Sequence, residues 1–289
     1  MRRLTRDKFT TVLDPNQPPA ITIESGEELL VETWDAYMGA RENLTEYRPR
    51  GPATGPIFVE GAVRGDALRV DLLSIDVDDS ALHHVRLGHG FLPERFNDSY
   101  PTIMQIRDGY LHLKNGLKVP LRPSVGLIAT SPGRLQQTAS DSGSYGGDID
   151  VKEMVAGSTV WLPVFVEGGL LVMGDMHAAV GDGAVGGTGA EVAAETHIRV
   201  TLEKGRRLRN LRVLTPDYFI TLSSAKRPNT AMKQAVREMV DFLAQEKGMD
   251  PYDAYTLLSL AGDVRISRTF RPISPCKMML ARSVFDQLG

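Results

Sequence analysis

The stretch LRVDLLSIDV, residues 68–77, is the clearest signal for the fold of this chain. Its apolar residues Leu68, Val70, Leu72 and Val77 alternate with charged or polar neighbours for most of its length. Successive side chains of a strand point to opposite faces, so this alternation places the apolar side chains on one face. The stretch therefore predicts a β-strand with one buried face.

Similar short runs, separated by Gly, Pro and Asp, fill the first two thirds of the chain. They are rich in β-branched residues and predict further strands at 57–62, 103–107, 160–166, 170–173 and 197–202. The segment VRGDA, residues 63–67, connects the first of these runs to the strand at 68–77. Its Gly-Asp pair is typical of a hairpin turn, so we expect these two strands to be joined by one.

The pattern changes after Ser223. From Thr230 to Lys247 the apolar residues recur every three or four positions, which predicts an amphipathic helix. Asn229 or Thr230 can cap its start, and Gly248 can take the left-handed conformation at its end.

A second helix is predicted from Asp250-Pro251 to Gly262, because Pro suits the first helical turn and Gly the residue beyond the last. A strand at 264–270 follows. No repeat, low-complexity tract or linker divides the chain, so we expect one domain over 1–289. Residues 1–222 would be mainly β, and 223–289 would hold the helical hairpin and a closing strand.

The composition is that of an ordinary globular protein. Hydrophobic residues make up 42% of the 289 residues and charged residues 24%, which excludes a mainly disordered chain. The 33 Lys and Arg and 36 Asp and Glu give a net charge of -3, without the basic excess that phosphate contacts require. We therefore expect no nucleic-acid partner.

Cys276 is the only cysteine, so disulfides and Cys-rich metal sites within the chain are excluded, and a reducing cytoplasm is expected. The N-terminal MRRLTRDKFT is followed by polar, Pro-rich sequence rather than the apolar core of a signal peptide. The longest uncharged apolar run, Met154–Val166, is shorter than the ~18 residues that span a bilayer. We expect a soluble protein with no membrane partner.

Glycines concentrate in one part of the chain. Thirteen of the 28 lie within 133–189, so the backbone there must turn tightly. Acidic residues and a histidine are interleaved with them: Asp141, Asp148, Asp150, Asp175, His177, Asp182 and, just beyond, Glu191. Carboxylates and an imidazole held by turn glycines suit a small polar or metal site, although each aspartate could instead only close a turn through its side-chain oxygens.

The sharpest element in this region is GDMHAAVGDG, residues 174–183. Asp175 and His177 are two apart, so in an extended segment they share a face and could bind one metal ion through oxygen and nitrogen. Asp182 could add a third ligand after a turn. His177 could equally be a hydrogen-bonded core histidine, and we expect structural roles for the other five: His83, His84, His89, His112 and His197.

Several stretches resemble the acetamidase/formamidase family. The longest and most specific is GGDIDVKEMVAGSTVWLPVFVEGGLLVMGDMHAAVGDG at 146–183, supported by TGPIFVEGAVRGDALRV at 54–70 and DAYTLLSLAGDVRIS at 253–267. VETWDA at 31–36 and VPLRPSVGLIATSPG at 119–133 add to the resemblance, which covers most of the chain in the family's order. It implies a mostly β fold of the sandwich type, association of identical subunits into a homodimer or higher oligomer, and hydrolysis of small aliphatic amides to ammonia and a carboxylate.

On the family motif, we expect Asp150, Asp175 and His177 to bind a divalent metal ion, zinc or calcium. Asp182 or Glu191 would be the catalytic carboxylate that transfers protons. Such a metal-assisted hydrolase makes chemical sense, because a bound cation activates water and polarises the poorly electrophilic amide carbonyl. Further contributions could come from Asp148, Glu32 and Asp35, with surface or turn roles equally open for the last two.

Two residues depart from the family motif. GGNxD reads GGDID here, which places Asp148 where asparagine is usual, and GDGE reads GDGA, which places Ala184 where glutamate is usual. Two alternatives to an amidase therefore stay open. One is a non-catalytic small-molecule binding or interaction protein on the same scaffold, and the other is a hydrolase of a different C–N or ester substrate.

The two departures generate a prediction. One change adds a negative charge and the other removes one, so the charge facing a cation is preserved if both positions line one pocket, where an uncompensated charge costs several kcal/mol. Asp148→Asn should then weaken metal binding or turnover strongly, and adding Ala184→Glu should restore much of the loss. A double-mutant cycle measures this coupling, and strictly additive effects would mean that Asp148 only closes a turn after Gly147.

Overall fold

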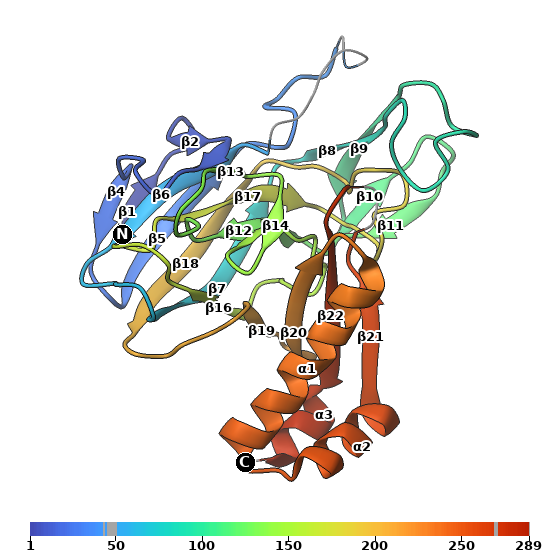
Figure 1. The fold of residues 1–289 in the computed structure, drawn as a ribbon. Coiled ribbons are helices and arrows are strands. Elements are labelled where there is room, and N and C mark those ends of the chain that lie inside the picture. The colour runs from blue at the N-terminus through green and yellow to red at the C-terminus, as the bar shows by residue number, and fades with distance from the viewer. Residues whose placement is uncertain (43, 45–50, 269–270, 289) are drawn as a thin grey trace.

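The structure is a computed structural model that describes residues 1–42, 44, 51–268 and 271–288. Strands contain 42% of the residues and helices 14%, which confirms the mostly β fold. Two large sheets form the body of the molecule, and the helices gather at its C-terminal end (Figure 1). Within the described residues, no helix has the length and apolar character that crossing a membrane requires.

The first sheet has nine strands. In spatial order they are β1 (Arg2–Leu4), β5 (Glu27–Thr33), β18 (Ala194–Glu203), β7 (Ala67–Val77), β16 (Thr159–Pro163), β19 (Arg212–Leu214), β20 (Tyr218–Ala225), β22 (Ser274–Ala281) and β21 (Gly262–Ile266). The strand predicted at 68–77 is β7, a central strand between β18 and β16. Those predicted at 160–166 and 197–202 correspond to β16 and β18.

The second sheet has seven strands and carries the acidic residues of interest. Its order is β14 (Ser142–Gly143), β15 (Gly146–Asp148), β12 (Ser124–Ala129), β17 (Leu171–His177), β6 (Ala53–Val59) and β2 (Phe9–Thr10), with β4 (Ile21–Ile23) also paired to β6. Leu68 and Val70 of the first sheet and Val125 and Met173 of the second belong to one buried cluster. The two sheets therefore enclose a common core.

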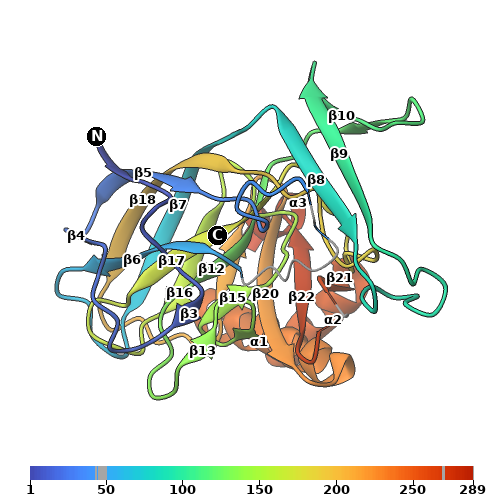
Figure 2. The same cartoon turned by 90° about the horizontal axis from the view of Figure 1, so that it is seen from above.

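Two smaller sheets complete the β structure. β3 (Val12–Leu13) pairs with β13 (Gln137–Thr138), and a four-stranded sheet has the order β11 (Lys118–Pro120), β10 (Tyr110–His112), β9 (Tyr100–Arg107) and β8 (Ser80–Val85). The latter projects from the body of the molecule (Figure 2). It exposes Tyr100, Ile103 and Tyr110.

The predicted helical hairpin is confirmed. It consists of α1 (Pro228–Lys247) and α2 (Pro251–Ala261), followed by the short α3 (Arg282–Phe285) and the 3₁₀ turn η1 (Asp286–Leu288). α1 packs on β20 and β22 through Met239 and Leu243, which are buried with Phe219 and Met278. Gly248 ends α1 with φ +68°, as expected for a left-handed cap.

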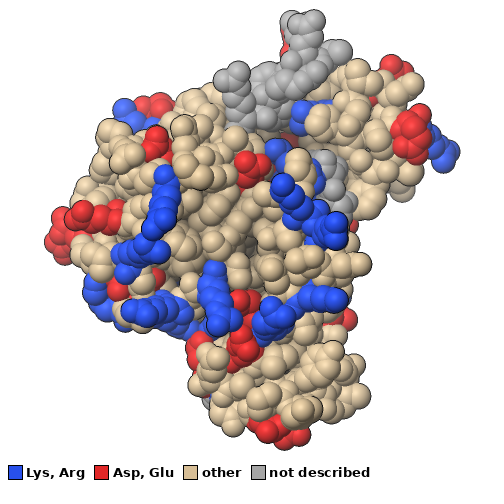
Figure 3. Space-filling model, viewed as in Figure 1, with Lys and Arg blue, Asp and Glu red and all other residues tan. Residues whose placement is uncertain are grey.

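Ion pairs also join α1 to the nine-stranded sheet and its loops. Arg209 pairs with Asp241 at 3.1 Å and Arg206 with Glu246 at 3.3 Å. Basic and acidic groups are interleaved where the helices meet the body of the molecule (Figure 3). The basic side chains at this junction are therefore compensated locally by acidic ones.

Two local predictions were wrong. The segment 63–67 turns, but β6 and β7 lie in different sheets, so it connects the two layers instead of closing a hairpin. α1 begins at Pro228 without a side-chain cap, because Pro starts the helix before Asn229 and Thr230 are reached. Gly262 follows the last residue of α2, as predicted, in an extended conformation with φ −101°. The closing strand predicted at 264–270 corresponds to β21, which begins at Gly262 and stops at Ile266; residues 269–270 lie outside the described residues.

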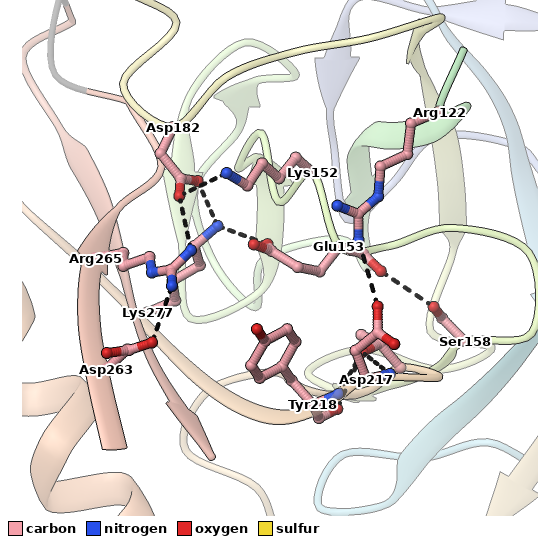
Figure 4. Close-up of polar contacts among 11 residues, drawn as sticks. Arg122, Lys152, Glu153, Ser158, Asp182, Asp217, Tyr218, Asp263, Arg265 and Lys277 are labelled. Atoms are coloured by element: carbon pink, nitrogen blue, oxygen red, sulfur yellow. Dashed lines mark hydrogen bonds and ion pairs between the residues drawn. The ribbon is translucent and has the colours of Figure 1, made fainter. Parts of the chain in front are cut away.

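A buried lysine ties the two sheets together. Lys277 of β22 is fully buried, and its Nζ lies 2.6 Å from Oε2 of Glu153 and 2.6 Å from Oδ1 of Asp182 (Figure 4). Glu153 lies in the loop after β15 and Asp182 in the loop after β17. Lys152 adds a further contact to Asp182 at 3.0 Å. Both loops that leave the second sheet at this end are thus fixed to the first sheet.

This network predicts the effect of removing its central charge. Lys277→Met leaves the buried carboxylate of Glu153 uncompensated, so it should lower the free energy of unfolding by about 3–5 kcal/mol. Adding Glu153→Leu should recover part of the loss. Denaturant unfolding measures both, with Lys226→Met at an exposed lysine as the control; equal losses in the single and double variants would contradict this account.

Candidate active site

A small pocket lies where β15 and β17 of the seven-stranded sheet end. Its volume of about 30 Å³ is room for roughly two water molecules. Charged side chains dominate its lining: Arg86, Asp148, Asp150, Asp175, His177, Glu191, Arg268 and Arg271. Residues with little or no side chain, Ala36, Gly51, Gly187 and Gly189, form other parts of the wall. The pocket is therefore small and strongly polar.

The backbone is strained at the two aspartates predicted as metal ligands. Asp150 has φ +48° and Asp175 has φ +51°, the left-handed region that residues other than glycine rarely adopt. Asp175 has this positive φ within β17, so the strand is not regularly extended there. The expectation that Asp175 and His177 share a face had assumed a regularly extended segment. Strain of this kind persists only where surrounding structure enforces it, and it clusters at functional sites.

Asp150, Asp175 and His177 are brought together. One potential ligand atom from each lies within 4.8 Å of the others, and all three residues are buried, so the group could hold a metal ion. Nε2 of His177 is 3.9 Å from Oδ1 of Asp150 and 3.9 Å from Oδ2 of Asp175. Oδ1 of Asp150 is buried and accepts no hydrogen bond from the described residues. An acceptor without a donor, facing an imidazole nitrogen, fits a bound cation.

Glu191 completes one side of this cluster. Its Oε1 lies 3.3 Å from Nε2 of His177 and accepts a hydrogen bond from the backbone N–H of Gly189 at 2.8 Å. The backbone of Glu191 bridges both His177 and Leu82, which fixes the side chain at the pocket wall. Its other oxygen, Oε2, is buried and has no hydrogen-bond partner among the described residues. Glu191 thus presents one free acceptor atom beside the predicted ligands.

Asp148 pairs with arginines. Its Oδ2 contacts Nη1 of Arg268, which is almost completely buried, and lies 3.4 Å from Nη2 of Arg271. Burial alone would raise the pKa of Asp148, but the two guanidinium groups hold it below its usual value. Gly183 forms an isolated backbone bridge with Arg268, so Ala184 directly follows a residue whose backbone contacts that of this arginine.

The carboxylates of the pocket repel one another. Burial, and then the charge of Asp148, raise the pKa of Asp150 to about 7. Burial and the charge of Glu191 raise the pKa of Asp175 well above its usual value. Burial lowers the pKa of His177, but Glu191, Asp175 and Asp150 outweigh it and raise the value to about 10. Without a cation, the cluster therefore favours bound protons.

Three other predicted residues lie outside the pocket. Asp182 is held by Lys277 and Lys152, and their charges outweigh burial and keep its pKa below the usual value (Figure 4). Glu32 faces away on β5, where it pairs with Arg3 at 2.7 Å. Asp35 is buried and closes a turn, because its Oδ1 accepts the backbone N–H of Tyr37 at 2.7 Å. This turn carries Ala36 to the pocket wall.

The pocket contains three arginines that the sequence does not reveal as site residues. Arg86 follows β8, whereas Arg268 and Arg271 follow β21, so segments far apart in the chain supply them. Nothing in their local sequence distinguishes them from surface arginines. Two of the histidines expected to be structural form side-chain contacts outside the pocket: His84 with Tyr37 at 3.0 Å and His197 with Glu28 at 2.8 Å.

The repulsion predicts how Asp175→Asn affects stability. A carboxyl group whose pKa is raised on folding destabilises the protein above its unfolded pKa of about 3.9, and the loss grows as the pH rises towards the raised value. With chelator at about pH 7, Asp175→Asn should therefore raise Tm by roughly 2–4 °C. In excess Zn²⁺ the unchanged protein should have the higher Tm, because only it is strongly stabilised by binding the ion. Thermal melts test this, with Asp98→Asn at an exposed position as control; a lower Tm in chelator would refute it.

Known proteins resemble this chain in sequence and in fold. The model of the Acetamidase/Formamidase family matches residues 134–287. The formamidase of Methylophilus methylotrophus is 28% identical over 255 residues, which cover 66% of this chain and 63% of that protein, less than two thirds of its length.

Two solved structures are similar over almost their whole length. A predicted acetamidase/formamidase from Thermoanaerobacter tengcongensis has a TM-score of 0.95 and 32% identity, with 100% of this chain and 98% of that chain covered. An acetamidase from Bacillus halodurans has a TM-score of 0.94 and 33% identity, with 99% of each chain covered. The family match spans more than half of the chain and includes Asp148, Asp150, Asp175, His177 and Glu191. The chain thus belongs to the acetamidase/formamidase family.

Proposed function

We propose that this protein is a metal-assisted amidohydrolase that cleaves the C–N bond of small aliphatic amides, such as formamide or acetamide, to ammonia and a carboxylate. The observation that carries the proposal is the buried group of Asp150, Asp175 and His177 with Glu191 at its side. The family membership and the names of the relatives support the substrate class.

A divalent cation would be held by Asp150, Asp175 and Nε2 of His177. Oxygen and imidazole donors suit a borderline or hard cation, zinc or calcium among them. When bound, it would lower the pKa of a water molecule and polarise the amide carbonyl. Its charge would also offset the repulsion that raises the pKa values of Asp150 and Asp175.

Glu191 is the proposed proton-transfer residue. It has one buried oxygen without a hydrogen-bond partner among the described residues, and the backbone N–H of Gly189 orients the other. Such a carboxylate can accept a proton from the attacking water and return it to the departing nitrogen. Asp182 suits this role less, because two lysines already occupy its carboxylate outside the pocket.

The pocket also limits the substrate. Its lining is mainly charged side chains and small residues, which suits a small polar amide better than a long acyl chain. The positive groups Arg268 and Arg271 lie on the Asp148 side of the pocket. They are placed to attract the carboxylate product or the carbonyl oxygen.

Two alternatives are tested by the same experiment. A binding or interaction protein would release no ammonia from any amide, and a hydrolase of another C–N or ester substrate would act only on that class. The homo-oligomer implied by the family remains a proposal; the exposed Tyr100, Ile103 and Tyr110 of the projecting sheet are compatible with it.

The proposal predicts metal-dependent ammonia release from formamide or acetamide. Chelation should abolish turnover and return of the metal should restore it, with elemental analysis of the folded protein identifying the ion. Full activity in metal-free protein would overturn the mechanism.

Variants define the roles of the residues. His177→Ala should abolish turnover while the cooperative melt persists, and Glu191→Gln should lower kcat roughly 10²–10⁴-fold. His112→Ala, in the projecting sheet, is the matched control and should leave kcat unchanged. If His177→Ala instead unfolds the protein and activity follows the folded fraction, His177 is a core histidine.

A further inference from the structure

Besides Oδ1 of Asp150 and Oε2 of Glu191, two further buried polar atoms at or beside the pocket have no hydrogen-bond partner among the described residues. They are Nδ1 of His177 and Oγ of Ser124, whose residues are 2% and 1% exposed. A buried polar group left without a partner costs about 1–3 kcal/mol, so two such atoms in one place call for a physical explanation.

The two residues are directly opposite each other. Ser124 begins β12 and His177 ends β17, and the antiparallel register pairs them. Residues opposite each other in antiparallel strands share a face, with Cβ atoms about 4.5–5.5 Å apart. A serine side chain has three staggered χ1 positions, which direct its hydroxyl differently over the sheet face that the two residues share.

Two glycines hold the imidazole ring in place. A Cβ on Gly126 would lie 2.6 Å from Cε1 and 3.0 Å from Nδ1 of His177, and a Cβ on Gly189 would lie 2.5 Å from Cδ2. The ring therefore packs closely against both glycine backbones, with little room to tilt. Rotation of the ring about χ2 would exchange the nitrogen that faces Asp150 and Asp175. A hydrogen bond to Nδ1 would favour one of these two ring orientations.

We propose that Ser124 is a positioning residue of the site, whose hydroxyl accepts a hydrogen bond from Nδ1–H of His177 and so keeps Nε2 directed at Asp150 and Asp175. Nδ1 carries a proton both in the imidazolium and in the neutral tautomer that offers Nε2 to a cation, so serine serves as acceptor in either form. Partners of this kind fix the ring orientation of metal-binding histidines. The metal-binding consequence rests on the proposed function, whereas the hydrogen bond itself does not.

The first test uses the metal-free protein. With ¹⁵N-labelled histidine and chelator present, we expect a slowly exchanging Nδ1–H resonance of His177 in the unchanged protein and in Ser124→Thr, which keeps the hydroxyl. In Ser124→Ala this resonance should be lost or shifted upfield. Ser131→Ala is the matched control, because Ser131 is also buried with an Oγ that has no partner among the described residues. An unaltered resonance in Ser124→Ala would overturn the proposal.

The second test measures the affinity for Zn²⁺ alone, by competition with a chromophoric chelator. Ser124→Ala should weaken binding about 10–100-fold, whereas Ser124→Thr and Ser131→Ala should stay close to the unchanged protein. Equal affinity in Ser124→Ala and Ser131→Ala would argue against the proposal. If the unchanged protein binds no divalent cation, the metal-assisted function fails, and the Nδ1–H resonance alone then decides the role of Ser124.

Discussion

Four carboxylates are buried within one small pocket, those of Asp148, Asp150, Asp175 and Glu191, and the rest of the site is arranged around the repulsion among them. Buried charge is tolerated only where opposite charge and hydrogen bonds compensate it. Arg268 and Arg271 compensate Asp148, and Nη1 of Arg268 also lies 3.8 Å from Oδ2 of Asp150. Asp150, Asp175 and Glu191 all face Nε2 of His177. The carboxylates of Asp150, Asp175 and Glu191 thus converge on one imidazole nitrogen, and a cation bound there would relieve their mutual repulsion.

The fold holds these groups together against their repulsion. Asp150 and Asp175 adopt positive φ angles, and Gly126 and Gly189 allow the backbone to approach the His177 ring closely. Behind the pocket, Lys277 fastens the loops after β15 and β17 to the first sheet. Strain at the ligands is thus balanced by rigid attachments outside the pocket, as expected where geometry is needed for chemistry.

The two departures from the family motif acquire a physical setting in this arrangement. Asp148, at the position where asparagine is usual, supplies the negative charge that Arg268 faces. Ala184, at the position where glutamate is usual, follows Gly183, whose backbone bridges Arg268. Both positions are therefore connected to the same buried arginine. Under the charge-balance hypothesis, a glutamate at position 184 would compete with Asp148 for the guanidinium group of Arg268. The double-mutant cycle would measure that competition.

The sequence by itself determined the β-rich class and the helical hairpin, because these depend on local periodicity. It paired Asp175 with His177 by their spacing, whereas Asp150, 25 residues earlier, joined them only through the resemblance to the family motif. It did not distinguish Glu191 from Asp182, since both are acidic residues near the same glycines. Only the tertiary structure separates them, by placing Asp182 against Lys277 of a distant strand and Glu191 against His177. The sequence likewise did not identify Arg86, Arg268 and Arg271 as pocket residues. Only the tertiary structure sets the charge partner of such an arginine, as where Arg268 meets Asp148 from a distant part of the chain.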